Sequence, residues 1–376
     1  MAKRILVLSA AVGAGHMRAA QAVELALKEL DPKAEIRNVD VLTLTNAAFR
    51  RVYSKTYMDL AHSAPHLVGY LYELFDKPSK KEHPFGERMK KLVQEVNFSK
   101  LIALMQENWD LLVNTHFLPA EICSDLRKKG KLSTPQFIVT TDFETHRMWV
   151  HTPCEQYFTA TEEGAAYLAS MGVPKGIINT TGIPIHPLFS RPKDRAECLK
   201  RQGLVGDRAL VVQMAGGFGV GPIRQIYEGL LECATPLELV VVAGKNEKAK
   251  KDLEKVKVPA RHRAKVLGFT DQMDELMQVA DLVVSKPGGL TTSELLARGA
   301  AMAIVNPIPG QESRNSDFLL ENGAAIKINS LATLSYKVGA LLADPVRLAQ
   351  MKANAKRLGR PQAAFDVAAK ALAWES

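Results

Sequence analysis

The chain has 376 residues, which is more than one ordinary hydrophobic core holds, and this length predicts two domains. Hydrophobic residues make up 47% and charged residues 24% of it, as in globular proteins, and no apolar run is long enough to span a bilayer. The net charge of +9 suggests an anionic partner. Nucleic acid is disfavoured because there is no recognition motif and no Lys/Arg-rich run. Two explanations of the charge remain: the protein binds an anionic membrane surface, or it is simply a basic protein without such a partner.

The start of the chain and its cysteines indicate the compartment. Lys3 and Arg4 lead directly into a predicted strand with no cleavage site, so we expect no signal peptide. The four cysteines are scattered without a Cys-x-x-Cys pair, which favours reduced thiols over a disulfide framework or a metal site. Both observations predict a cytoplasmic protein.

The first half of the chain alternates apolar strands with helical segments. Strands are predicted at residues 4–9, 35–39, 111–115, 136–141 and 156–159. This alternation is typical of an α/β domain with a parallel, doubly wound sheet.

A glycine turn with a histidine follows the first predicted strand. Gly13 and Gly15 lack the third glycine of a dinucleotide-binding fingerprint, so that interpretation is weak. His16 begins the next helix at the carboxyl edge of the strand, where open α/β sheets bind ligands. A lone histidine is usually structural, but at this position a functional role is favoured.

A long helical insertion is predicted at about residues 46–108. It interleaves aromatic residues with basic ones, with ten Lys/Arg against six Asp/Glu between residues 46 and 100. Such a mixture suits a membrane interface. On the residues alone, a pair of core-packing helices with a solvated face is an equal alternative.

A second α/β unit is predicted after a linker rich in Pro and Gly, Thr180 to Pro192. Its strands are predicted at residues 209–214, 238–243, 264–267, 281–285 and 302–305. Asp344 and Pro345 give a start signal for the last helices.

The turn after the predicted strand 281–285 carries the most informative residues. Gly288 and Gly289 offer bare backbone N–H groups at the start of a helix, which suits a diphosphate. Glu294, one turn into that helix, can accept hydrogen bonds from both hydroxyls of a ribose. The segment Pro309–Glu312 supplies an amide and a carboxylate that can reach sugar hydroxyls. A nucleotide-sugar site is suggested, although the glycines alone also suit an ordinary βα turn.

Seven short motifs come in an order that resembles one family. They are Val12–His16, Val139–His151, Thr181–Ile185, Met214–Gly217, Val241–Asn246, Ser285–Gly289 and Pro309–Glu312. Together they resemble the processive diacylglycerol glucosyltransferases and the monogalactosyldiacylglycerol synthases, which form one inverting family with the peptidoglycan lipid II-forming transferase. The resemblance covers Ile5 to about Arg357, and around Asp142 and His146 it is closer to the glucosyl enzymes. The first turn departs from it, because Ala14 stands where the family often has glycine or asparagine.

The resemblance implies the GT-B fold, with two Rossmann-like, doubly wound parallel-sheet domains facing across a cleft. It implies an acceptor and membrane-binding domain at 1–190 and a nucleotide-sugar domain at 191–360. A C-terminal helix at 361–376 is expected to pack back on the first domain. The resemblance also favours membrane docking for the insertion, and thus a cytoplasmic enzyme held peripherally at the inner face of the cell membrane.

The resemblance further implies a UDP-sugar donor and no metal, since backbone amides replace the cation in GT-B enzymes. The residues implied for the diphosphate are Gly216, Gly217, Pro287, Gly288 and Gly289, with Lys245 or Asn246 as a further phosphate contact. Those implied for the rest of the donor are the backbone around Phe269 for the uracil, Glu294 for the ribose, and Gln311 with Glu312 for the hexose.

The implied reaction is attack by a lipid hydroxyl, on diacylglycerol or a related acceptor, at the anomeric carbon of a UDP-hexose such as UDP-glucose. The hydroxyl must lose its proton to a base within hydrogen-bond reach. His16 is favoured because the dipole of its helix lowers its pKa and so favours the neutral form. Asp142, just past a strand end, is expected to be the base itself or the partner of His16.

Three alternatives stay open. One is a UDP-GlcNAc transferase acting on a polyprenyl-linked, peptidoglycan-type acceptor. Another is a UDP-GlcNAc 2-epimerase of the same fold, which would need several acid/base groups around the sugar but no insertion of aromatic and basic residues. The third is a non-catalytic nucleotide- or lipid-binding module. Glucose, galactose and GlcNAc are all admitted as the donor sugar.

Overall fold

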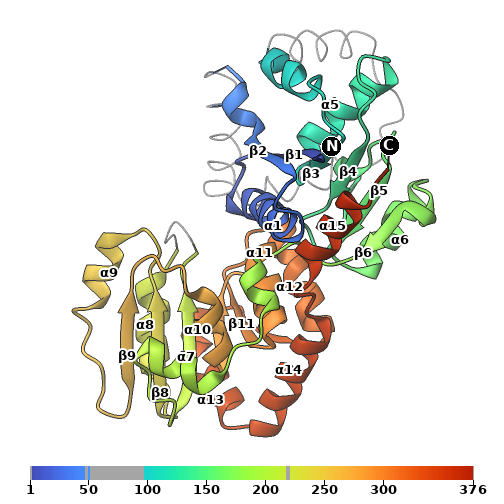
Figure 1. Ribbon diagram of the computed structural model, residues 1–376. Helices are drawn as coiled ribbons and strands as arrows, with labels where there is room; N and C mark the ends of the chain where they lie inside the picture. Colours follow the sequence, from blue (N-terminus) through green and yellow to red (C-terminus); the bar gives the residue numbers. More distant parts are fainter. Residues whose placement is uncertain (1, 47–49, 51–96, 217–220, 376) are drawn as a thin grey trace. The chain divides into compact units, whose positions relative to one another are not determined.

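The computed structural model describes residues 2–46, 50, 97–216 and 221–375. Most of the predicted insertion therefore lies outside the described residues, as does Gly217. The chain divides into two compact units (Figure 1). The first comprises Met1–Pro187, Pro309–Gln311 and Gln362–Ser376, and the second comprises Leu188–Ile308 and Glu312–Pro361. From the sequence, domain boundaries were predicted directly after residue 190 and directly after residue 360.

The first unit is built on a parallel sheet of six strands in the order β2-β1-β3-β4-β5-β6. The strands are β1 (Arg4–Ser9), β2 (Glu35–Asp40), β3 (Leu111–Asn114), β4 (Gln136–Val139), β5 (Gln156–Thr159) and β6 (Ile178–Thr180). Strands β3, β4 and β5 are buried along their whole length, as expected where helices cover both faces of a parallel sheet. The five strands predicted here are confirmed, whereas β6 was not predicted.

Helices flank the first sheet (Figure 1). They are α1 (Ala14–Leu30), α5 (Phe117–Lys128), α6 (Glu162–Ser170) and α15 (Ala363–Leu372), with a further helical segment at residues 97–105. His116 caps α5 by accepting from the Leu118 amide at 3.0 Å, and Thr161 caps α6 by accepting from the Gly164 amide at 3.0 Å. These caps satisfy amides that the first turn of a helix leaves without partners.

Helix α15 packs against α1, although the two are far apart in the sequence (Figure 1). The buried cluster that they share with the sheet includes Ile5, Val7, Val23, Ala26, Leu27, Val367, Ala368 and Ala371. The Lys3 ammonium donates to the Leu372 carbonyl at 2.9 Å and also to the Trp374 carbonyl. The last helix is thus part of the core of the first unit.

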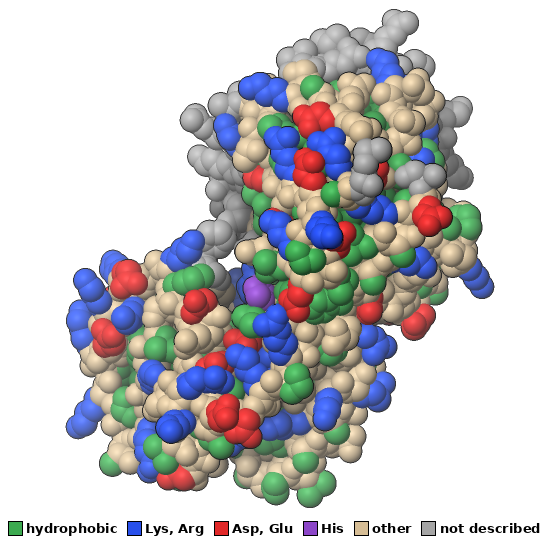
Figure 2. Space-filling view, viewed as in Figure 1, with side chains coloured by type: hydrophobic (Ala, Val, Ile, Leu, Met, Phe, Trp, Pro, Cys, Tyr) green, Lys and Arg blue, Asp and Glu red, His purple; other side chains and the backbone are tan. Residues whose placement is uncertain are grey.

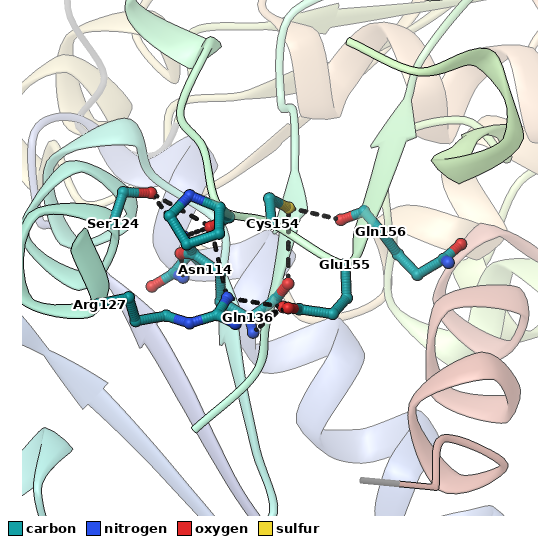
Figure 3. A network of polar contacts seen from close by, with 8 residues as sticks. Asn114, Ser124, Arg127, Gln136, Cys154, Glu155 and Gln156 are labelled. Atoms are coloured by element: carbon teal, nitrogen blue, oxygen red, sulfur yellow. Dashed lines mark hydrogen bonds and ion pairs between the residues drawn. The ribbon is translucent and has the colours of Figure 1, made fainter. Parts of the chain in front are cut away.

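A polar network lies at the amino ends of β4 and β5 (Figure 3). The Gln136 side chain accepts from Asn114 at 2.9 Å and donates to the Ser124 hydroxyl at 2.6 Å. Arg127 of α5 forms a two-pronged ion pair with Glu155 at 2.8 and 2.6 Å, and Glu155 also accepts from the Gln136 amide at 2.7 Å. The network ties α5 to β3, β4 and the residue before β5, so it has a structural role.

The second unit has its own parallel sheet of six strands, in the order β12-β11-β10-β7-β8-β9. The strands are β7 (Ala209–Met214), β8 (Leu237–Val242), β9 (Arg263–Leu267), β10 (Leu282–Ser285), β11 (Ala301–Val305) and β12 (Ala325–Ile328). The helices are α7 (Arg195–Gln202), α8 (Ile223–Leu231), α9 (Glu247–Leu253), α10 (Met273–Val279), α11 (Gly289–Arg298), α12 (Gln311–Glu321), α13 (Leu334–Leu342) and α14 (Pro345–Leu358). The five predicted strands are confirmed, and β12 is additional.

The core of the second unit follows the two-residue period of its strands. Leu239 and Val241 of β8 belong to one buried cluster, which also holds Leu230 of α8 and Val338 of α13. Val240, which points to the other face of the sheet, is also fully buried. Both faces of this sheet are therefore covered, and the prediction of two doubly wound parallel α/β sheets is confirmed.

Candidate active site

His16 lies in the first turn of α1, after the loop that follows β1, and it is partly exposed. Gly13, the residue before that helix, has a φ of 88°, a left-handed conformation that glycine adopts without strain. The His16 Nδ1 atom lies 2.7 Å from the Thr141 hydroxyl oxygen. Its ring meets the His116 ring edge-on, with the ring centroids 4.5 Å apart. The loops that follow β1, β3 and β4 thus meet at His16.

Asp142 follows β4 and is 2% exposed. Its Oδ2 atom accepts from the Trp149 indole N–H at 2.8 Å and lies 3.1 Å from His146 Nε2. In the described part of the chain, its Oδ1 atom has no hydrogen-bond partner. Two rings therefore fix the carboxylate, and one of its oxygens is left for a further donor.

The structure brings His16 and Asp142 to the same edge of the first sheet. The Trp149 ring connects them, because its centroid lies 6.3 Å from that of His16 while its N–H donates to Asp142. The two residues do not share a hydrogen bond. His16 pairs with the Thr141 hydroxyl, whereas the Asp142 carboxylate pairs with His146 and Trp149. An imidazole that can accept a proton and a carboxylate close to it are thus available at this edge.

The electrostatics of this group favour a neutral imidazole beside an ionised carboxylate. Burial of its ring lowers the pKa of His16, and the Asp142 carboxylate opposes part of that effect. Burial acts to raise the pKa of Asp142, but the hydrogen bond and charge of His146, with His16 and Trp149, outweigh it and leave that pKa lowered. The pKa of His16 is shifted in the expected direction, and burial is the largest cause of the shift.

His116 lies outside the seven motifs, and Thr141 lies inside Val139–His151 but was given no role there. Burial lowers the pKa of His116 well below its usual value, and the neighbouring His16 acts in the same direction. His116 comes two residues after the end of β3, at the same carboxyl edge as His16. The rule that selected His16 could therefore have found it.

In the second unit, the turn after β10 enters α11 through Gly288. No side chain caps this helix among the described residues, so its first amides face the turn directly. Asn315 of α12 donates to the Pro287 carbonyl at 2.9 Å, and a Cβ atom on Gly288 would lie 3.9 Å from Glu312 Oε1. The structure thus brings Pro287, Gly288 and Glu312 together, and it adds Asn315, which was not predicted.

The carboxylates predicted for the sugar and the ribose lie in different surroundings. Glu294 is 1% exposed, in the second turn of α11. Glu312, in the first turn of α12, is partly exposed, and its Oε2 atom accepts from the Ile308 amide at 2.7 Å. Burial raises the pKa of Glu312, and the Ile308 hydrogen bond and the Lys286 charge oppose part of that effect. Gln311, the first residue of α12, is partly exposed.

The remaining predicted donor residues follow β7, β8 and β9. Gly216 follows β7 with a φ of 71°, another left-handed position. The Lys245 ammonium lies 5.6 Å from the centre of the Phe269 ring, which is 65% exposed. The Asn246 side chain caps α9 by accepting from the Ala249 amide at 2.9 Å. Lys245 and Phe269 are therefore neighbours at the carboxyl ends of β8 and β9, and the Phe269 ring is open to a ligand.

Neither a metal centre nor a membrane span is found in the described part of the chain. No group of three or more His, Cys, Asp and Glu side chains there is arranged to hold a metal ion. None of the helices described is both long and apolar enough to cross a bilayer. The absence of a metal from the reaction stays a prediction.

Two family models match the chain. Residues 16–185 match monogalactosyldiacylglycerol (MGDG) synthase, and residues 223–367 match the glycosyltransferase family 28 C-terminal domain. A processive diacylglycerol beta-glucosyltransferase of Bacillus mycoides (strain KBAB4) is 30% identical over 380 residues, which cover 98% of this chain and 93% of the relative. The chain belongs to the processive diacylglycerol beta-glucosyltransferase family. It is therefore a glycosyltransferase, which confirms the resemblance drawn from the seven motifs.

Solved structures identify the fold of this member of the processive diacylglycerol beta-glucosyltransferase family. MurG of Acinetobacter baumannii is similar with a TM-score of 0.64 at 18% identity, over 98% of both chains. HepE of Anabaena, solved in complex with UDP-glucose, has a TM-score of 0.55 at 13% identity, over 98% of this chain and 99% of its own. At such identities the likeness shows the fold alone, and it is the predicted GT-B fold.

Proposed function

We propose that this glycosyltransferase moves glucose from UDP-glucose to diacylglycerol or a related lipid at the cytoplasmic face of the cell membrane. The observation that carries the proposal is the full-length similarity to a processive diacylglycerol beta-glucosyltransferase. The complex of HepE with UDP-glucose, on the same fold, supports the donor. The net charge of +9 supports peripheral attachment to an anionic membrane.

The proposed reaction is a single displacement. A beta product from an alpha-linked UDP-glucose requires inversion, so the lipid oxygen attacks the anomeric carbon on the face opposite UDP. The new carbon–oxygen bond forms as the bond to the phosphate oxygen breaks, and UDP leaves with the electron pair. We assign the hydroxyl proton to His16, because its lowered pKa keeps the imidazole neutral near pH 7. The ionised Asp142 then stabilises the imidazolium that forms.

The proposed donor site is built mainly from the second unit and uses no metal. Backbone amides at the start of α11 meet the negative charge that grows on the diphosphate, and they need no reorganisation as the bond breaks. The other residues assigned to the donor are Gly216, Gly217 and Lys245 or Asn246 for the phosphates, Phe269 for the uracil, Glu294 for the ribose, and Gln311 and Glu312 for the hexose.

The test is incubation of the purified chain with UDP-glucose, UDP-galactose or UDP-GlcNAc, each combined in turn with diacylglycerol and with a polyprenyl-linked, peptidoglycan-type acceptor. Lipid products are separated by thin-layer chromatography, and the nucleotide sugars are analysed for epimerisation. A glucolipid formed only with UDP-glucose supports the proposal. Conversion of UDP-GlcNAc into its C2 epimer, or transfer only to a polyprenyl-linked acceptor, overturns it. A His16→Ala chain purified in the same way controls for a contaminating transferase.

A further inference from the structure

A groove of about 490 Å³ lies along β12, the edge strand of the second sheet. Its walls come from α12, β12, α13 and the start of α14. Leu320 and Ile326 contribute apolar surface to it, and Lys327, Lys337 and Arg347 contribute positive charge. This space is large enough to hold the polar end of one lipid molecule.

Every charged residue that lines the groove is basic. Lys337 donates to the Lys327 carbonyl at 2.8 Å, which fixes its ammonium at the edge of β12. The Arg347 amide donates to the Asp344 carboxylate at 3.0 Å, which fixes the first turn of α14. The face that Figure 2 shows has basic and acidic side chains interspersed, unlike the lining of the groove. Cations gathered in one groove repel each other, and a bound anion removes that repulsion.

Exposed apolar side chains accompany these cations. Tyr336, which lines the groove, is 75% exposed, and Val346, next to Arg347, is 79% exposed. Aromatic and aliphatic side chains beside Lys and Arg are typical of surfaces that enter the membrane interface. A free phosphate ion would contact the cations alone and leave the apolar lining in water.

We propose that this groove binds the anionic headgroup of a membrane phospholipid. The phosphate lies among Lys327, Lys337 and Arg347, and the carbons of the lipid lie against the apolar lining. The second unit thereby has a lipid contact built from its own residues alone. The inference rests on the proposed function only in so far as a membrane is the place where the enzyme works.

The test is co-flotation of the full chain with vesicles of phosphatidylcholine, with and without phosphatidylglycerol, in the absence of any UDP-sugar. The variant is Lys327→Gln/Lys337→Gln/Arg347→Gln. Each cation near an anionic surface contributes a factor of about five, so this variant, which lacks three cations, should bind the phosphatidylglycerol vesicles roughly 100-fold more weakly. The matched control removes the same charge beside β9, at the other edge of the sheet, as Lys251→Gln/Lys255→Gln/Lys257→Gln. It should bind like the unchanged chain.

Equal flotation of the groove variant and the control variant overturns the proposal. Calorimetric binding of inorganic phosphate that the groove variant loses, together with equal flotation of the groove and control variants, would assign the groove to a soluble anion and also overturn the proposal. Circular dichroism checks that each variant is folded. If the triple variant does not fold, a Tyr336→Ser variant at the exposed tyrosine of the groove is tested instead. Weaker flotation of this variant supports the lipid site, and unchanged flotation overturns it. Because no sugar is transferred in this assay, its result is independent of the proposed reaction.

Discussion

The Nδ1 atom of His16 lies 2.7 Å from the hydroxyl oxygen of Thr141. This hydrogen bond fixes the orientation of an imidazole that otherwise contacts aromatic rings only edge-on or at a tilt. Thr141 directly precedes Asp142, so one short loop after β4 positions both the proposed base and its carboxylate. If His16 is the base, Thr141 is therefore expected to contribute to catalysis by orienting the imidazole, although it takes no part in the reaction itself.

Replacement Thr141→Val should lower kcat about 5- to 30-fold with little change in the KM for UDP-glucose. The lost hydrogen bond corresponds to about 1–2 kcal/mol, and it orients the base without touching the donor. Thr141→Ser should restore most of the turnover. The control is Thr140→Val, because the neighbouring Thr140 is equally buried and its hydroxyl has no hydrogen-bond partner in the described structure. An equal loss in both valine variants would show that packing, not orientation, is responsible.

Replacements His16→Ala and Asp142→Asn should lower turnover far more than donor affinity. Loss of a general base typically slows a reaction about 10²- to 10⁴-fold. Asn at position 142 keeps the shape and an oxygen for the Trp149 N–H but removes the charge that stabilises the imidazolium. Steady-state kinetics and calorimetric titration with UDP measure the two effects. Turnover near that of the unchanged chain in either variant would remove that residue from the catalytic group.

The pH profile of kcat/KM should have its acid limb below the ordinary histidine value of about 6.5. His16 acts as a base only when it is neutral, and burial lowers its pKa in the folded chain. Activity should therefore rise with pH through this lowered pKa and be fully present at pH 7. Initial rates at low UDP-glucose and saturating lipid, over a pH series, measure it. An acid limb centred above 6.5 would contradict His16 as the base.

The buried His116 should make the first unit less stable as the pH falls below about 6.5. Its pKa is lowered on folding, so the unfolded chain binds more protons below that pH and stability is lost as the pH falls. The thermal midpoint should decrease from pH 7 to pH 5. His116→Asn keeps an acceptor that can cap α5 but cannot titrate, so this variant should show a smaller decrease. An unchanged pH dependence would assign the effect to other groups.

Replacement Glu294→Gln should weaken UDP binding roughly 10- to 150-fold. A carboxylate that accepts from both ribose hydroxyls contributes about 1.5–3 kcal/mol, and the amide cannot accept twice in the same way. Calorimetric titration with UDP measures the change. Glu321→Gln, at an exposed position on α12, is the control and should bind UDP normally. Unchanged affinity in a folded Glu294→Gln chain contradicts the assignment.

Most strands could be predicted because they contain an apolar run between turn signals, although β2 also carries Arg37 and Asn38. The two that were missed, β6 and β12, are edge strands of only three and four residues, and each carries a polar residue, Asn179 or Lys327. An edge strand need not be apolar throughout, and strands this short leave few residues to show a pattern, whereas the edge strands β2 and β9 have six and five residues and were predicted. The missed strand β12 is also the one that borders the proposed lipid groove.

The candidate site could be predicted only in part, for a related reason. His16 and Asp142 stand at the carboxyl ends of recognisable strands, and that position, together with the glycine turn before His16 and the resemblance around Asp142, selects them. The role of Thr141 depends on a contact with a residue 125 positions away, and that of Asn315 on the Pro287 carbonyl 28 positions away. Such contacts follow from the order of strands in a sheet, which the spacing of residues along the chain does not specify.

The packing of α15 on α1 has a consequence for biosynthesis. The first unit starts with β1, yet its core is complete only when Ala364, Val367 and Ala371 have left the ribosome. By then all of Leu188–Pro361 has already emerged, so the second unit is able to fold first. A chain released before Ala363 would leave an apolar stripe of α1 uncovered, and would be a target for chaperones and proteases even with its second unit fully formed.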